Sequence, residues 1–105
     1  MLADAAQTLA LLAHTIPELD CDYYAASLHK WLLAPVGSGL LWMRKPLAAK
    51  ISPLFPPWQG ANGMRRFMGF GTYPEPLAAA AAEAIDLDEK IGATRKAGRL
   101  RFLTR

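Results

Sequence analysis

Apolar residues occur along this chain in short runs that turns interrupt. Residues 5–13 (AAQTLALLA) are rich in Ala and Leu, which predicts a helix, and Pro17 breaks that pattern. Residues 21–27 (CDYYAAS) carry adjacent aromatic side chains and favour a buried strand, although periodicity alone does not separate strand from helix there. Residues 35–39 form a glycine-containing loop, and the apolar run 40–43 (LLWM) predicts a second buried strand.

The second half of the chain is first irregular and then helical. Residues 52–63 hold three prolines and two glycines, which predicts an irregular loop. Residues 67–73 (FMGFGTY) are typical of a short extended piece with a glycine turn. From Pro74 or Pro76 onward the alanine-rich sequence predicts a long helix, because proline suits a first helical turn.

A glycine divides the helical region. Gly92 is expected to interrupt or cap the long helix, and a second helical stretch follows from about Thr94 to the chain end. Strand signals and helix signals alternate along the sequence, which predicts an α/β fold class.

Composition narrows the class of protein. The 105 residues match one domain, and the hydrophobic fraction of 52% argues against disorder. No run approaches about 18 apolar residues, so no transmembrane helix is expected. The single cysteine cannot form an intramolecular disulfide, and no basic region precedes the first apolar stretch. A reduced, cytoplasmic location is therefore the expectation, with no membrane partner.

Positive charge gathers at the C-terminal end. The net charge is +3, but residues 90–105 alone carry +6, so residues 1–89 sum to 3 − 6 = −3. Such a stretch suits an acidic partner, either nucleic acid or acidic lipid. A solvated helix face is the simpler interpretation, because only Phe102 interleaves with the charges and no nucleic-acid motif appears. No nucleic-acid partner is expected.

Asp4 and Gln7 stand three residues apart before an apolar run. This spacing resembles a capping box, in which Asp4 would simply cap a helix. The alternative is chemical: a carboxylate at a strand end can hold a heterocyclic nitrogen protonated, since an opposite charge favours the charged form. Gln7 would then lie on the same side and donate to a ring oxygen.

Lys30 lies in an unusual place for a free ammonium group, between an apolar segment and Trp31. A partly apolar pocket lowers the pKa of a lysine and frees its amine to attack a carbonyl. Ser27 and His29 are hydrogen-bonding groups that suit a phosphate. The alternative interpretation is a partly buried lysine at the end of an element.

Gly71-Thr72 precedes the long helix, where backbone N–H groups and a hydroxyl can bind an anion. Alternatively, Thr72 is an ordinary N-cap. Cys21 is expected to be a small buried hydrophobe, and His14 a helix C-cap. With two histidines and no clustered carboxylates, no metal site is expected.

Together these pieces resemble the class V aminotransferase family, a group of pyridoxal 5′-phosphate (PLP) enzymes. The family includes cysteine desulfurases, selenocysteine lyases and isopenicillin-N-epimerase-like proteins. The resemblance covers nearly the whole chain. It rests on the order and spacing of Asp4-Ala5-Ala6-Gln7, Ser27-Leu28-His29-Lys30-Trp31, Pro35-x-Gly37-x-Gly39 and Gly71-Thr72.

The resemblance implies a role for each residue singled out above. Lys30 would form a Schiff base with PLP, and Asp4 would pair with its pyridinium nitrogen. Gln7 would bind the phenolic oxygen, while Ser27 and His29 would contact the phosphate.

Thr72 would reach the phosphate of a neighbouring subunit, which implies a homodimer. The substrate would be an amino acid, and the chemistry aminotransfer, epimerisation, or elimination and desulfuration. The implied fold is that of the type I (aspartate aminotransferase-like) PLP-dependent transferases. Residues 1–73 would be the C-terminal part of the large PLP-binding domain, and residues 74–105 the linker helix and start of the small domain.

The chain also departs from the family pattern. Asp4 lies almost at the start, so the strands and the phosphate loop that precede it in the family are missing. Arg99 and Arg101 come too early for the family's substrate-carboxylate arginine, and Cys21 does not match the desulfurase nucleophile. The sequence predicts a central fragment that is weakly active or inactive alone. The competing hypothesis is a non-catalytic remnant or interaction protein whose basic C-terminal stretch binds an acidic partner.

Overall fold

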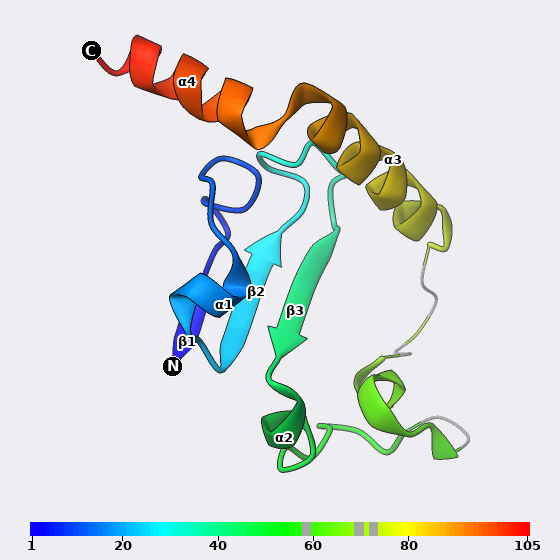
Figure 1. The fold of residues 1–105 in the computed structure, drawn as a ribbon. Coiled ribbons are helices and arrows are strands. Elements are labelled where there is room, and N and C mark those ends of the chain that lie inside the picture. Colours follow the sequence, from blue (N-terminus) through cyan, green and yellow to red (C-terminus); the bar gives the residue numbers. More distant parts are fainter. Residues whose placement is uncertain (58–59, 69–70, 72–73) are drawn as a thin grey trace.

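The computed structural model describes residues 1–57, 60–68, 71 and 74–105, and shows a small mixed sheet with two helices across one end (Figure 1). Strand β1 (Leu2–Asp4) pairs in parallel with β2 (Tyr23–Ser27), and β3 (Gly39–Met43) pairs antiparallel on the other side of β2. The α/β fold class is therefore confirmed.

The sheet register decides which side chains share a face. Asp4 lies beside Ala25, and Ser27 lies opposite Gly39. Because side chains alternate along a strand, Asp4, Ala25 and Ser27 lie on one face. Tyr24 lies on the other face, as one of the buried residues at the centre of the larger core cluster.

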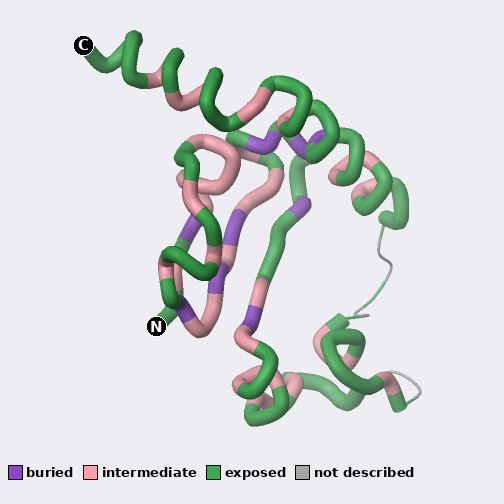
Figure 2. Tube along the Cα trace, viewed as in Figure 1, coloured by how far each residue is buried: buried purple, intermediate pink, exposed green. Residues whose placement is uncertain are grey.

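The larger core cluster lies on the Tyr24 face of the sheet. Its buried members are Ala5, Cys21, Tyr24 and Ala26, with Leu9, Ile16, Leu19 and Trp42 partly buried around them. Cys21 is fully buried, which confirms its prediction as a small hydrophobe. Figure 2 shows buried positions along β2, whereas much of β3 is exposed.

The helix predicted for residues 5–13 is wrong. The segment forms tight turns instead, with Leu9 N donating to Ala5 O at 3.1 Å and Leu12 N to Thr8 O at 3.0 Å. Ala10 has a φ of +62°, a left-handed conformation that a right-handed helix does not contain. Ala5 belongs to the core cluster that contains Tyr24, and Leu9 packs against that cluster. This tertiary packing overrides the helix propensity of the segment.

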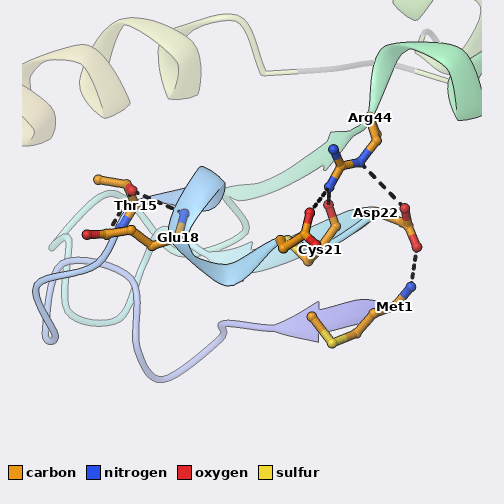
Figure 3. A network of polar contacts seen from close by, with 7 residues as sticks. Met1, Thr15, Glu18, Cys21, Asp22 and Arg44 are labelled. Atoms are coloured by element: carbon orange, nitrogen blue, oxygen red, sulfur yellow. Dashed lines mark hydrogen bonds and ion pairs between the residues drawn. The ribbon is translucent and has the colours of Figure 1, made fainter.

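A short helix, α1 (Ile16–Leu19), contains Pro17, the residue predicted to end the helical pattern of residues 5–13. Thr15 N donates to Glu18 Oε2 at 2.6 Å and Glu18 N to Thr15 Oγ1 at 3.4 Å, a complete capping box (Figure 3). Pro17 occupies the first turn, where its missing N–H costs nothing. These hydrogen bonds from Thr15 lower the pKa of Glu18.

The strand predicted for residues 40–43 is confirmed as β3, but the prediction that it is buried is wrong for most of its length. Leu40 is 39% exposed and Leu41 52% exposed, and among the described strands β3 is at the edge, paired with β2 on one side. Helix α2 (Lys45–Ala48) and a 3₁₀ helix, η2 (Gly63–Phe67), follow. Phe67 is thus helical rather than extended, and part of the predicted 67–73 segment lies outside the described residues.

Arg44 ties the end of β3 to the start of β2 (Figure 3). Its Nη2 donates to Asp20 Oδ1 at 2.8 Å and to the carbonyl oxygen of Cys21 at 3.0 Å, and its Nε lies 3.5 Å from Asp22 Oδ1. The amino group of Met1 also pairs with Asp22. The hydrogen bond from Met1 lowers the pKa of Asp22, and the charge of Arg44 adds to the effect.

Two helices close the chain, as predicted. Helix α3 (Pro76–Ile91) begins at a proline, and α4 (Ala93–Leu103) follows directly. Gly92 separates them with a φ of +84°, which is the expected interruption. The buried Ala84 packs α3 into a second small cluster with Leu32 and Ala34, next to the loop that carries Lys30.

Candidate functional site

Asp4 and Ser27 line one open hollow of about 530 Å³ on the face of the sheet away from the core. The remaining lining residues are mainly small or apolar, and include Ala25, Gly39 and Leu41. Asp4 ends β1 and is followed by turns, not by a helix, so the interpretation as a helix cap is wrong. Its Oδ1 instead accepts the N–H of Ala6 at 3.0 Å, which orients the carboxylate at the strand end.

Gln7 lies in the turn after β1 and reaches the loop after β2. The indole Nε1–H of Trp31 donates to Gln7 Oε1 at 3.2 Å. This bond uses the amide oxygen of Gln7, so its amide NH₂ is the group left to donate to a ligand. The contact places Gln7 beside the residue that follows Lys30.

Lys30 lies in a tight loop that immediately follows β2. The loop closes through Leu33 N donating to Lys30 O at 3.0 Å and Ala34 N donating to Leu28 O at 3.0 Å. Leu33 has a φ of +64°, so the loop reverses sharply behind the lysine. Lys30 itself is half-buried, in agreement with the sequence interpretation of a lysine at an element end.

His29 is held by the same loop. Its Nδ1 lies 3.0 Å from the carbonyl oxygen of Ser38. A carbonyl oxygen only accepts, so Nδ1 carries the proton and Nε2 is left as the second polar atom of the ring. The Ser38 hydroxyl in turn donates to Pro35 O at 2.6 Å, which makes the glycine loop a support for the imidazole.

The structure brings together part of the predicted set. Asp4 and Ser27 share the hollow, and Gln7 is joined to the Lys30 loop through Trp31. Among the described residues that line the hollow, His29 and Lys30 do not appear. Thr72 lies outside the described residues, so both of its predicted roles stay predictions; the N-cap of α3 is Glu75.

One polar pair on the core face of the sheet was not predicted from the sequence. His14 Nε2 lies 2.9 Å from the hydroxyl of Tyr24, and His14 Nδ1 lies 3.0 Å from Leu12 O. His14 therefore satisfies a buried tyrosine and does not cap a helix. Burial raises the pKa of Tyr24, which is 1% exposed. Nothing in the spacing of these residues signals the contact.

The described ranges hold neither a cluster of metal ligands nor a membrane-spanning helix. Residues 1–57, 60–68, 71 and 74–105 contain no group of three or more His, Cys, Asp or Glu side chains placed to hold a metal ion. Within the same ranges, every helix is too short or too polar to cross a membrane.

Comparison with known proteins agrees with the residue pattern. A cysteine desulfurase of Wigglesworthia glossinidia brevipalpis is 38% identical over 64 residues, which is 61% of this chain and 14% of that protein. A cysteine desulfurase of Salmonella enteritidis PT4 shares 38% over the same coverage, and one of Escherichia coli O6:K15:H31 shares 36%. The matched stretch thus spans a small part of these relatives. The family model for class-V aminotransferases matches residues 1–95, and the chain belongs to this family.

Proposed function

We propose that this chain is part of a PLP-dependent class V aminotransferase-like enzyme, and that Lys30 is the residue that binds the cofactor covalently. The observation that carries the proposal is the placement of Asp4 and Ser27 on one hollow, with Gln7 bonded to the neighbour of Lys30. Family membership supports it, because members of the family use PLP. The type I transferase fold and the domain division at residues 73 and 74 belong to the same proposal.

The residues present fit the chemistry of PLP. The cofactor carries a ring nitrogen, a phenolic oxygen and a phosphate. For these three groups the chain offers, respectively, a carboxylate, an amide, and a hydroxyl together with an imidazole. The hollow of about 530 Å³ falls within the usual range for small-molecule sites. Asp4 is exposed at the hollow, and its carboxylate keeps acceptor capacity for a cationic partner beyond the one N–H that Oδ1 accepts.

Each residue would perform one task. PLP, when bound, supplies an aldehyde that reacts with amines and a ring that takes up electrons from a substrate carbon. Asp4 would hold a proton on the ring nitrogen, since its negative charge favours the protonated form. Gln7 would donate its amide NH₂ to the phenolic oxygen, because its Oε1 already accepts from Trp31.

Ser27 and His29 would bind the phosphate. Ser27 lines the hollow, and His29 has Nε2 left for this role because its Nδ1 is bound to Ser38. The Lys30 amine would take a proton from the substrate carbon at Nζ and return it. The fate of the proton and the side chain decides the outcome: delivery to a different atom gives aminotransfer, delivery to the opposite face of the same carbon gives epimerisation, and loss of a side-chain group gives elimination or desulfuration.

The substrate we propose is an amino acid, and the enzyme a cytoplasmic homodimer in which Thr72 contacts the phosphate of the neighbouring subunit. The relatives extend far beyond the matched stretch, which covers 14% of their length. We therefore expect weak activity or none from these 105 residues alone, and cofactor binding is the property to test.

The test is chemical labelling of the purified chain. PLP is added, the absorbance of the lysine adduct is recorded, and borohydride then reduces the adduct to a stable product. We expect adduct formation in the wild type, loss of it in Lys30→Ala, and retention in Lys50→Ala, an exposed lysine after α2. Equal labelling of wild type and Lys30→Ala rules out the role of Lys30.

A second candidate function rests on the cations of α4. Arg95, Arg99 and Arg101 are exposed, and residues 90–105 contain no acidic residue. We propose, as the alternative, that this helix binds an acidic partner. Binding to DNA or acidic vesicles would then weaken steeply with salt. Absence of salt-sensitive binding at low ionic strength removes this candidate.

A further inference from the structure

Lys96 of α4 reaches across the molecule to the turn that follows β1. Its Nζ donates to the carbonyl oxygen of Ala10 at 2.6 Å, and it also pairs with Asp88 of α3. The side chain is 19% exposed and that of Asp88 25% exposed, so both charges are largely withdrawn from water. One ammonium group thus joins three segments of the chain.

The turn held by Lys96 is the one that carries Gln7. Residues 5–12 are closed by Leu9 N donating to Ala5 O at 3.1 Å and Leu11 N to Thr8 O at 3.1 Å, and β1 fixes their start. Ala10 lies at the far end with a φ of +62°, a conformation that alanine rarely adopts without support. A charged donor on its carbonyl oxygen provides that support.

We propose that Lys96 is a positioning residue: by holding Ala10 it fixes the turn that presents Gln7 to Trp31, beside Lys30. The effect on the cofactor rests on the function proposed above, whereas the effect on Gln7 does not. Asp88 keeps the Lys96 side chain directed at the turn. Arg95, its neighbour on α4, is exposed and serves as the natural control.

The first arm of the test needs no cofactor. Hydrogen exchange of the Trp31 indole N–H is followed by NMR, with Trp31→Phe used to assign its signal among the three tryptophans. Lys96→Met keeps the aliphatic stem and removes the donor. We expect exchange about tenfold faster in Lys96→Met, wild-type exchange in Arg95→Met, and rescue by Lys96→Arg. Wild-type exchange in a folded Lys96→Met overturns the proposal.

A milder variant covers the case in which Lys96→Met does not fold. Asp88→Asn leaves the ammonium in place but removes its ion-pair partner. We expect faster indole exchange than in the wild type, with a smaller change than for Lys96→Met. An unchanged exchange rate in Asp88→Asn, with helical content retained by circular dichroism, also counts against the proposal.

The second arm asks whether Lys96 acts through Gln7. The pH dependence of the PLP adduct absorbance is compared in wild type, Lys96→Met, Gln7→Ala and the double variant. We expect Lys96→Met to shift the curve in the direction of Gln7→Ala, and the double variant to match Gln7→Ala. Additive shifts overturn the proposal. If no chain forms the adduct, the proposed function fails, and the indole arm still decides the role of Lys96.

Discussion

The indole N–H of Trp31 donates to the amide oxygen of Gln7 at 3.2 Å, across 24 positions of sequence. This bond joins the turn after β1 to the loop after β2, and so connects the two segments that carry most of the candidate site. The bond also orients the side-chain amide of Gln7. Because the oxygen is held by Trp31, the direction of the NH₂ group is fixed as well.

Replacing either Trp31 or Gln7 is therefore expected to weaken formation of the PLP adduct. Trp31→Phe removes the donor and Gln7→Ala the acceptor, and each should weaken formation of the PLP adduct several-fold. The double variant should be no worse than Gln7→Ala, because Trp31 acts on the cofactor only through Gln7. Titration with PLP, read by absorbance, gives the four affinities. Strictly additive losses would show that the two residues act separately.

Tyr24→Phe should destabilise the fold by about 1–2 kcal/mol, because it leaves His14 Nε2 without the hydroxyl that it contacts at 2.9 Å. Tyr23→Phe is the matched control, since Tyr23 is half-buried on the other face of β2 and its change should stay within about 0.5 kcal/mol. Urea unfolding followed by circular dichroism measures both. Equal midpoints for the two variants would contradict the buried pair.

Acid should weaken the fold partly through Glu18. The hydrogen bonds from Thr15 lower its pKa below the ordinary value of 4.5, so its contribution to stability is present above that pH. The contribution is lost as the pH falls through the lowered folded pKa. Glu18→Gln should therefore show a shallower loss of stability between about pH 6 and about pH 3 than the wild type or Glu83→Gln. If stability falls with pH in parallel for the wild type and both variants, Glu18 makes no pH-dependent contribution.

Two glycines near the C-terminus should respond to alanine with opposite signs. Gly92→Ala is expected to cost about 1–3 kcal/mol, because its φ of +84° is unfavourable for a residue with a Cβ. Gly98→Ala lies within α4, with nothing within 4 Å of the added carbon, and should stabilise by about 1 kcal/mol. Thermal unfolding distinguishes them. A stabilised Gly92→Ala would mean that α3 and α4 form one continuous helix.

Local sequence signals succeeded where they matched the final environment. Pro76 and Gly92 act as proline and glycine usually act at helix ends, so both helices were predicted near their observed limits. The adjacent aromatics of β2 also indicated a strand. The helix predicted for residues 5–13 failed, because packing against Tyr24 overrides the preference of Ala and Leu for helix.

Only part of the candidate site could be predicted from the sequence. The structure places Asp4 at the end of a strand, as the chemical alternative requires, whereas its pairing with a ring nitrogen stays a prediction. The partner of Gln7 was not foreseen, since an indole 24 residues away gives no local pattern. The capping box of Thr15 and Glu18 had a readable signal, Thr-x-x-Glu, that Pro17 obscured.

The central claim is that Lys30 binds the cofactor. The most direct measurement is mass spectrometry of the chain after incubation with PLP, borohydride reduction and proteolysis. The account predicts that, of Lys30, Lys45, Lys50, Lys90 and Lys96, the peptide with Lys30 carries the reduced adduct in excess. Labelling spread evenly over the five lysines, or concentrated on another one, would contradict it.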